Sequence, residues 1–284
     1  MPADASPLSV DAGGVELSGE QTGAGRPVVL LHGLTATRRY VVMGSRTLER
    51  SGHRVLAYDA RGHGRSSAAA DRDYGYERLA ADLLAVLDVT GVQRALLAGA
   101  SMGAHTAVRF ALAHPERVAA LALITPAYEP VAERARAEQE LAHWDALARG
   151  LREGGVDGFV AAYELAEVPE AWRKTIETVL RQRLAAHQHP EAVADALEVV
   201  PRSRPFEDMA ELAQLALPTL VVASRDEADP EHPLAVGESY ARAIAGATLA
   251  VEDAGTPPRS PIAWQGGQLS KLLVELAAHA DYGT

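Results

Sequence analysis

A serine between two glycines is the residue of this chain best suited to chemistry. Residues 96–104 read LLAGASMGA, so an apolar run ends at Ser101, with Gly99 and Gly103 two residues away on either side. A serine hydroxyl is a weak nucleophile until a base removes its proton. Catalysis at Ser101 would therefore need partners elsewhere in the chain.

The five residues 99–103 fit the pattern G-x-S-x-G. In that pattern the glycines permit a sharp strand-to-helix turn that raises the serine hydroxyl, and the next helix directs its N-terminus at the site. A strand-like run precedes Ser101, and a helical pattern continues to Leu112. We expect Ser101 to be a nucleophile; the alternative is a purely structural turn.

The stretch VVLLHGLTATRR, residues 28–39, follows the form of a strand that turns away at His32-Gly33. The turn would leave the N–H of Leu34 pointing toward Ser101. Together with the N–H of Met102, it would bind the oxyanion that forms when a carbonyl is attacked. His32 is a candidate base, although a ring that hydrogen-bonds within its own loop is the favoured interpretation.

A third stretch, YDARGHGRSS at residues 58–67, contains Gly62 and Gly64, which allow a tight turn. We expect Asp59 and Arg61 to hold this turn. His63 is again a candidate base that is better explained as a support for its loop.

Short apolar runs alternate with helical patterns, which predicts an α/β fold with a parallel sheet covered by helices. The runs are 28–31, 55–58, 96–100, 119–124, 220–223 and 249–251. A final helix is expected at about 263–280, and the first 14 residues resemble a loose end.

The alternation stops between about residues 127 and 215, where helical patterns follow one another. We expect a helical insertion at 127–215 and a core domain made of 15–126 and 216–284.

The three loop motifs, in this order and at these spacings, resemble the α/β-hydrolase superfamily. The resemblance implies a mostly parallel eight-stranded sheet, with the first two strands around residues 15–19, and places the insertion where that superfamily often carries its lid. It also implies a triad in the chain order nucleophile, acid, histidine.

The resemblance assigns the acid to the loop SRDEADPEHP, residues 224–233, where Asp226 matches the family acid and Pro230 the proline that often follows it. Asp229 is a second candidate. A carboxylate here would orient an imidazole; an aspartate that only caps the next helix is the alternative.

The family histidine is missing from its usual place, because Gly255 is followed by Thr256. Loss of that histidine from a serine triad costs on the order of a millionfold in turnover. Threonine is not basic at neutral pH, so another group must move the proton or the chemistry differs. The open candidates are His232, His63 and His32, the insertion residues His143, His187 and His189, and water or the substrate itself. His105 is expected to pack within its helix.

Two functions follow from these residues. The first is a serine hydrolase acting on a small carboxylic ester, lactone or thioester, with Ser101 as nucleophile and Asp226 as acid. The second keeps the fold without hydrolysis, as a small-molecule binding protein or a lyase- or isomerase-type enzyme; Thr256 favours it.

The composition of the chain limits the classes of molecule that it can bind. The 284 residues carry a formal net charge of −11 and no cysteine, which argues against nucleic-acid or anionic-membrane binding and excludes thiolate chemistry. We find no metal-ligand cluster, cofactor motif or targeting segment, and so expect a cytoplasmic protein that acts on a small molecule without a cofactor. The oligomeric state is open.

Overall fold

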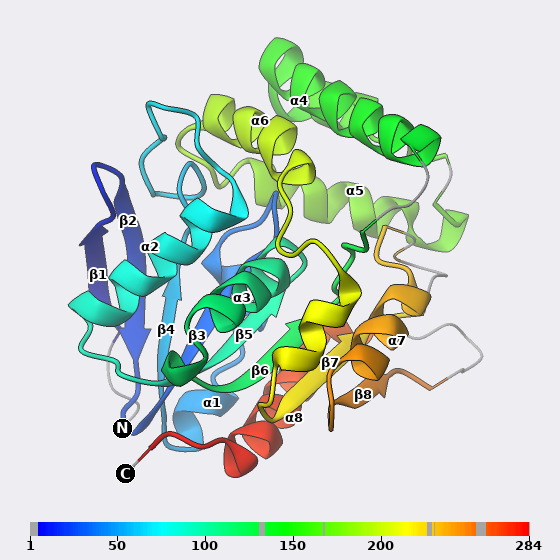
Figure 1. The fold of residues 1–284 in the computed structure, drawn as a ribbon. Coiled ribbons are helices and arrows are strands. Elements are labelled where there is room, and N and C mark those ends of the chain that lie inside the picture. Colours follow the sequence, from blue (N-terminus) through cyan, green and yellow to red (C-terminus); the bar gives the residue numbers. More distant parts are fainter. Residues whose placement is uncertain are drawn as a thin grey trace.

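The computed structural model describes residues 5–130, 134–166, 168–225, 229, 231–253 and 260–283. Within them the chain forms an eight-stranded sheet with helices on both faces (Figure 1). The strands are β1 Ser6–Asp11, β2 Glu16–Thr22, β3 Arg26–Leu31, β4 His53–Tyr58, β5 Ala95–Ala100, β6 Val118–Ile124, β7 Thr219–Ala223 and β8 Thr248–Val251. The α-helices are α1 Thr47–Arg50, α2 Tyr76–Val89, α3 Met102–Ala113, α4 Arg134–Ala162, α5 Glu170–Leu184, α6 Pro190–Val199, α7 Leu234–Ala243 and α8 Gly266–His279.

The strand order is β1-β2-β4-β3-β5-β6-β7-β8. The six neighbouring strands β4, β3, β5, β6, β7 and β8 are parallel to one another. Strand β2 runs antiparallel to both β1 and β4. The predicted α/β-hydrolase sheet is therefore confirmed. From β3 the chain moves outward to β4, and then returns to β5 on the other side of β3. The carboxyl ends of β3 and β5 thus flank the point where the strand order reverses, which is where open α/β sheets place their ligands.

Strand β6 is apolar at every position, and β3 is apolar from Val28 to Leu31, because both faces of these strands are covered. In β3, Val29 and Leu31 pack on the face of α2, α3 and α7, while Val28 and Leu30 pack on the face of α1 and α8. Two hydrophobic cores result, one on each side of the sheet.

The expectation of a loose N-terminus was wrong. Residues Ser6–Asp11 form β1, which pairs antiparallel with β2. Leu8 and Val10 are buried while Ser9 between them is exposed, an alternation with period two that a half-buried edge strand requires.

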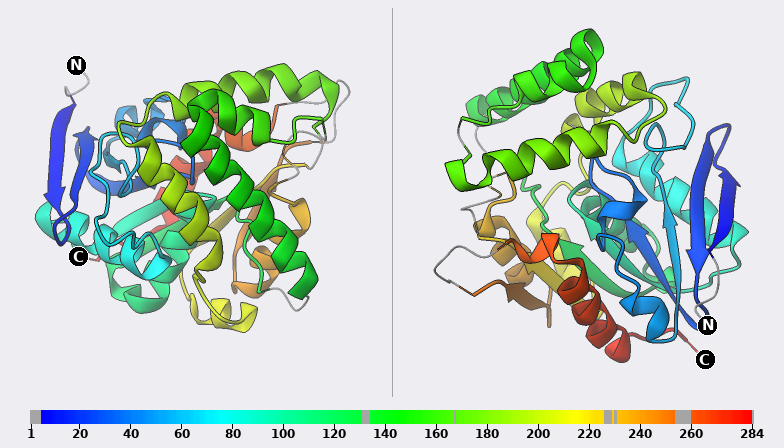
Figure 2. Two further views of the ribbon diagram at one scale, coloured as in Figure 1. Left: turned by 90° about the horizontal axis from the view of Figure 1, so that it is seen from above. Right: turned by 180° about the vertical axis from the view of Figure 1, so that it is seen from behind.

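Between β6 and β7 the described chain is helical, with α4, α5, α6 and the 3₁₀ segments Val200–Arg202 and Met209–Gln214. Helix α4 changes direction at Gly155, whose φ is 59°. Figure 2 shows α4, α5 and α6 lying across one end of the sheet. Their apolar side chains, such as Leu147, Leu180 and Leu197, continue the core of the α2 and α3 face.

Candidate active site

Ser101 occupies the turn between β5 and α3. Its φ of 50° and ψ of −114° lie outside the ordinary helical and extended regions, a conformation that costs a non-glycine residue about 1–3 kcal/mol. The Ser101 N–H holds the turn by donating to the Ile124 carbonyl at 2.9 Å. The side chain is partly exposed, and no hydrogen bond among the described residues engages its Oγ. The serine is thus held in a strained turn, and no described residue engages its hydroxyl.

The two flanking glycines are required by close backbone contacts. A Cβ at Gly99 would lie 2.1 Å from the Gly103 carbonyl oxygen, and one at Gly103 would lie 2.2 Å from that of Leu31. Both distances are well below what real Cβ atoms tolerate. Only glycine at these positions lets α3 begin directly against the ends of β5 and β3.

The backbone N–H groups of Leu34 and Met102 are the predicted oxyanion donors. Met102 is the first residue of α3, so its N–H has no partner within the helix. Leu34 lies in the loop after β3, next to Gly33, where an added Cβ would lie 3.5 Å from the Ser101 Cβ. In the described part of the chain, neither N–H donates a hydrogen bond, so both remain available to a ligand.

His32 and His63, both predicted candidate bases, are bound to backbone. The Nε2 of His32 accepts from the Ala60 N–H at 2.8 Å, and its Nδ1 lies 2.8 Å from the Gly33 carbonyl. The ring nitrogens of His63 lie 2.8 and 2.7 Å from the carbonyls of Arg61 and Leu34. Burial lowers the pKa of both rings. These rings link the loops after β3 and β4, as the loop-support interpretation proposed.

The turn after β4 depends on Asp59 and Arg61. A Cβ at Gly64 would lie 2.2 Å from Asp59 Oδ2, and the carboxylate accepts from the backbone N–H of Arg38 and Arg65 at 2.9 and 3.1 Å. Arg61 forms a buried bidentate pair with Asp82 of α2, at 2.6 and 2.7 Å. The loop is thereby fixed beside the site.

Two further histidines are also fully occupied. His187, which follows α5, accepts from the Gly64 N–H at 2.8 Å through Nδ1 and lies 3.1 Å from the Thr35 carbonyl through Nε2. It therefore ties the helical insertion to the loops after β3 and β4. His105, on α3, bonds Tyr76 Oη at 3.0 Å and the N–H groups of residues 127 and 128 at 3.1 Å. Burial lowers the pKa of each ring to about 3.

His232 has a different environment. Its Nδ1 lies 2.8 Å from Asp229 Oδ1 in the loop after β7, with the two side chains 19% and 14% exposed. Burial lowers the pKa of His232, but the charge of Asp229 and its hydrogen bond raise it more, so that the pKa lies above its ordinary value. Its Nε2 has no hydrogen-bond partner among the residues that the structure describes. This is the environment of an oriented imidazole.

Arg183 of α5 is a site residue that sequence reasoning missed. Its Nη2 would lie 4.0 Å from a Cβ at Gly33, so the guanidinium and Ser101 both border that glycine. Its Nε is buried without a hydrogen bond, and no carboxylate of the described residues lies within ion-pair distance. Its guanidinium carbon lies 5.9 Å from the centre of the Tyr40 ring. Among the described residues, Arg183 is thus a buried cation without a carboxylate in direct contact, although the charges of Glu231 and Asp229 act on it.

Two predicted site residues, Asp226 and Thr256, lie outside the described residues. Of the insertion histidines, His143 has its Nε2 3.8 Å from Glu231 Oε1, and His189 pairs with Glu191 at 3.5 Å with a ring that is 38% exposed.

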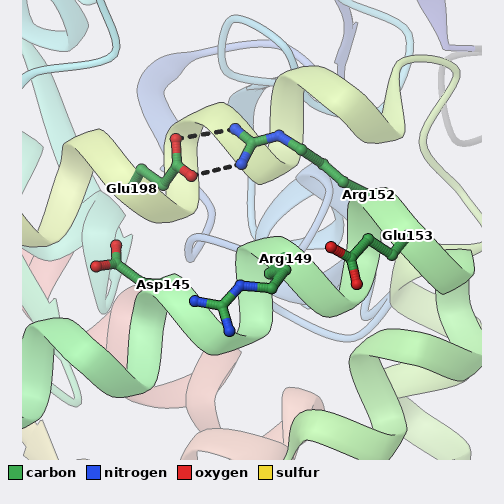
Figure 3. Close-up of a pocket in the computed structure, with 5 residues that line it drawn as sticks. All are labelled: Asp145, Arg149, Arg152, Glu153 and Glu198. Atoms are coloured by element: carbon green, nitrogen blue, oxygen red, sulfur yellow. Dashed lines mark hydrogen bonds and ion pairs between the residues drawn. The ribbon is translucent and has the colours of Figure 1, made fainter.

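A separate hollow of about 460 Å³ lies between α4 and α6 (Figure 3). Arg152 pairs there with Glu198 and with Asp195 of α6. Its lining residues come from α4 and α6 alone, and none follows β3, β5 or β7. Its ion pairs connect the two helices, and we assign it no part in the chemistry.

Residues 26–164 match the family model described as alpha/beta hydrolase fold. RutD of Variovorax paradoxus, whose name records a provisional assignment as a carbamate hydrolase, is 33% identical over 72% of this chain and 75% of its own. The chain belongs to the α/β-hydrolase fold family.

Other members of the family extend the comparison. A 2-hydroxy-6-oxononadienedioate/2-hydroxy-6-oxononatrienedioate hydrolase of Pseudomonas putida is 32% identical over 70% of this chain and 71% of its own. Among solved structures, a thermophilic esterase from Thermogutta terrifontis with malate bound has a TM-score of 0.74 at 27% identity, over 96% of this chain and 98% of its own. These relatives are hydrolases by name, and they support hydrolase activity in this family member. Within its described part, the chain has no helix long and apolar enough to cross a membrane.

Replacement of Gly103 by alanine tests the packing of the nucleophile turn. The new Cβ would overlap the Leu31 carbonyl, so we expect Gly103→Ala to lower the free energy of unfolding by about 1–3 kcal/mol, measured by urea denaturation. Gly267→Ala is the control, because Gly267 is also the second residue of a helix and has no neighbour within 4 Å of an added Cβ. An equal response of both variants would contradict the account.

Proposed function

We propose that this protein is a serine hydrolase that cleaves a small carboxylic ester, lactone or thioester through Ser101. The observation that carries the proposal is the strained turn at Ser101, with a φ of 50°, beside two backbone N–H groups that have no described partner. A turn that costs about 1–3 kcal/mol is typical of functional sites. A turn that served only to reverse the chain could use glycine at the same position.

The reaction follows from these groups. Ser101 Oγ attacks the acyl carbon, and the carbonyl electron pair moves onto the oxygen, where the N–H groups of Leu34 and Met102 stabilise the negative charge. Collapse of this intermediate breaks the bond to the alcohol or thiol, which leaves with a proton. Water then attacks the acyl-enzyme, and the acid is released with Ser101 restored. Loss of a single oxyanion donor costs such enzymes about 100- to 1000-fold in turnover.

Arg183 narrows the substrate class. A guanidinium presents a planar pair of donors that matches a carboxylate, and this one borders Gly33 without a described anionic partner. We infer that the preferred substrates carry a carboxylate besides the acyl group that is cleaved. Two relatives agree with this chemistry: the hydrolase from P. putida is named for dioate substrates, and the esterase from T. terrifontis was solved with malate.

Labelling with a fluorophosphonate probe tests the nucleophile. We expect the wild-type protein to be labelled at Ser101 and to hydrolyse p-nitrophenyl esters, and we expect Ser101→Ala to lose both activities. Ser239→Ala, at a partly exposed position on α7, is the control. A wild-type protein that neither reacts with the probe nor exceeds the buffer rate would overturn the proposal and favour a binding, lyase or isomerase function of the same fold.

The proposed role of Arg183 is tested by comparing a p-nitrophenyl hemiester of a dicarboxylic acid with p-nitrophenyl butyrate. A hydrogen bond to a charged group contributes about 1.5–3 kcal/mol, so we expect Arg183→Gln to lower kcat/KM for the hemiester about 10- to 100-fold, mainly through KM, and the value for the butyrate less than about threefold. Arg181→Gln is the matched control on α5, where Arg181 is 42% exposed and paired with Asp157. Equal losses on both substrates would show that Arg183 does not select for charge.

A further inference from the structure

The proposed hydrolase needs a base, and the usual histidine position holds Thr256. Most histidines near Ser101 are unsuitable because backbone or side-chain groups engage their rings. His32, His187 and His105 each accept from a backbone N–H through one nitrogen, and the other nitrogen also has a partner. His63 has a carbonyl oxygen beside each nitrogen. A base must present an unshared lone pair to the serine hydroxyl, and none of these rings does.

His232 meets that requirement. Asp229 Oδ1, at 2.8 Å, accepts the Nδ1–H, which fixes the tautomer whose Nε2 carries the lone pair. The ring is 19% exposed, and no hydrogen bond among the described residues uses Nε2. A carboxylate that holds Nδ1–H is the arrangement that orients a catalytic imidazole and stabilises it after it gains a proton.

The surroundings of His232 place it on the same side of the molecule as Ser101. It follows β7, whose carboxyl end lies on the same edge of the parallel sheet as that of β5. The charge of His232 acts on His105, four residues after Ser101 on α3, and the charge of Arg183 acts on His232. His232 thus interacts electrostatically with two groups that neighbour the serine in the fold, His105 on α3 and Arg183 beside Gly33.

The helical insertion covers the His232 loop. Glu231, the residue before His232, accepts a hydrogen bond from Tyr163 and lies 3.8 Å from His143. Among the described residues, the charged and titratable groups that act on His232 are Asp229 and Glu231 from its own loop, Arg183 from α5 and His105 from α3. Tyr163 and His143 contact Glu231. The acidic groups favour the protonated ring, and Arg183 opposes it.

We propose that His232, oriented by Asp229, is the general base that activates Ser101, in place of the histidine that the family carries after the last strand. This inference rests on the proposed function. His232 Nε2 takes the Ser101 proton while Oγ bonds to the acyl carbon, and the resulting imidazolium returns that proton to the leaving alcohol or thiol. In the second half, Nε2 takes a proton from the attacking water and gives it to Ser101 Oγ as the acyl group leaves. Asp229 is a positioning residue that accepts the Nδ1–H of the ring.

The experiment compares His232→Asn, Asp229→Asn and Asp226→Asn, with His114→Asn as the control. His114 follows the far end of α3 and lies 3.8 Å from Glu116. Each variant is checked for folding by circular dichroism and thermal melting, and its rate of fluorophosphonate labelling and its kcat/KM for a p-nitrophenyl ester are measured against pH.

We expect His232→Asn to lose at least 100-fold in both rates and His114→Asn to lose less than threefold. The base must be neutral, and Asp229 raises the pKa of His232, so wild-type kcat/KM should rise with pH through a midpoint above 6.5. Asp229→Asn removes the carboxylate that raises the pKa of His232. Its activity should be lower, and its acidic limb should move to lower pH, which a loss of stability alone would not produce.

The outcomes separate this inference from the proposed function. Labelling of the wild type together with a loss below 100-fold in His232→Asn overturns the base assignment and leaves the hydrolase intact. A large loss in Asp226→Asn with an unchanged pH profile in Asp229→Asn also overturns it, and assigns the acid to Asp226. If His232→Asn does not fold, the pH profile of Asp229→Asn decides alone. A wild type without labelling or turnover removes both proposals.

Discussion

The site depends on how closely the start of α3 packs against the ends of β3 and β5. That approach leaves no room for a Cβ at Gly99 or Gly103, and Ser101 between them adopts a conformation that is costly for a non-glycine residue. The same approach brings the first turn of α3, with its unpaired N–H groups, next to the loop that contains Leu34. One packing constraint therefore places the serine at the start of α3, beside the loop after β3.

The surrounding structure stabilises this arrangement by fixing the loops after β3 and β4, and no described residue hydrogen-bonds to the Ser101 hydroxyl. His32 and His63 connect the loops after β3 and β4, and His187 connects these loops to the helical insertion. Burial lowers the pKa of all three rings. Histidines that look catalytic in the sequence thus act as supports in the structure, and the pair His232–Asp229, in a partly exposed loop, keeps the features of a base.

Much of this architecture could be predicted from the sequence because its signals are local. Apolar runs mark buried parallel strands, and G-x-S-x-G marks the turn at Ser101. The fold and the six apolar runs predicted as strands are confirmed, whereas the first two strands, expected around residues 15–19, lie at Ser6–Asp11 and Glu16–Thr22. Strand β1 was missed because it buries only Leu8 and Val10 at the edge of the sheet, and so few apolar positions are easily mistaken for an irregular terminus. The role of Arg183 was missed because its signal is tertiary. Its position three residues after Leu180 puts a cation on the apolar stripe of α5, which is unusual, but only the fold places that stripe beside Gly33. The pairing of His232 with Asp229 is a local i, i+3 contact, yet nothing in the sequence ranks it above Asp226.

The central claim is that Ser101 faces an oxyanion site formed by the N–H groups of Leu34 and Met102. A crystal structure of the protein after reaction with a fluorophosphonate tests it most directly. The account predicts a covalent bond from Ser101 Oγ to phosphorus, with the phosphoryl oxygen about 2.7–3.1 Å from both nitrogens. A phosphoryl oxygen directed to solvent, or bound by other donors, would contradict it.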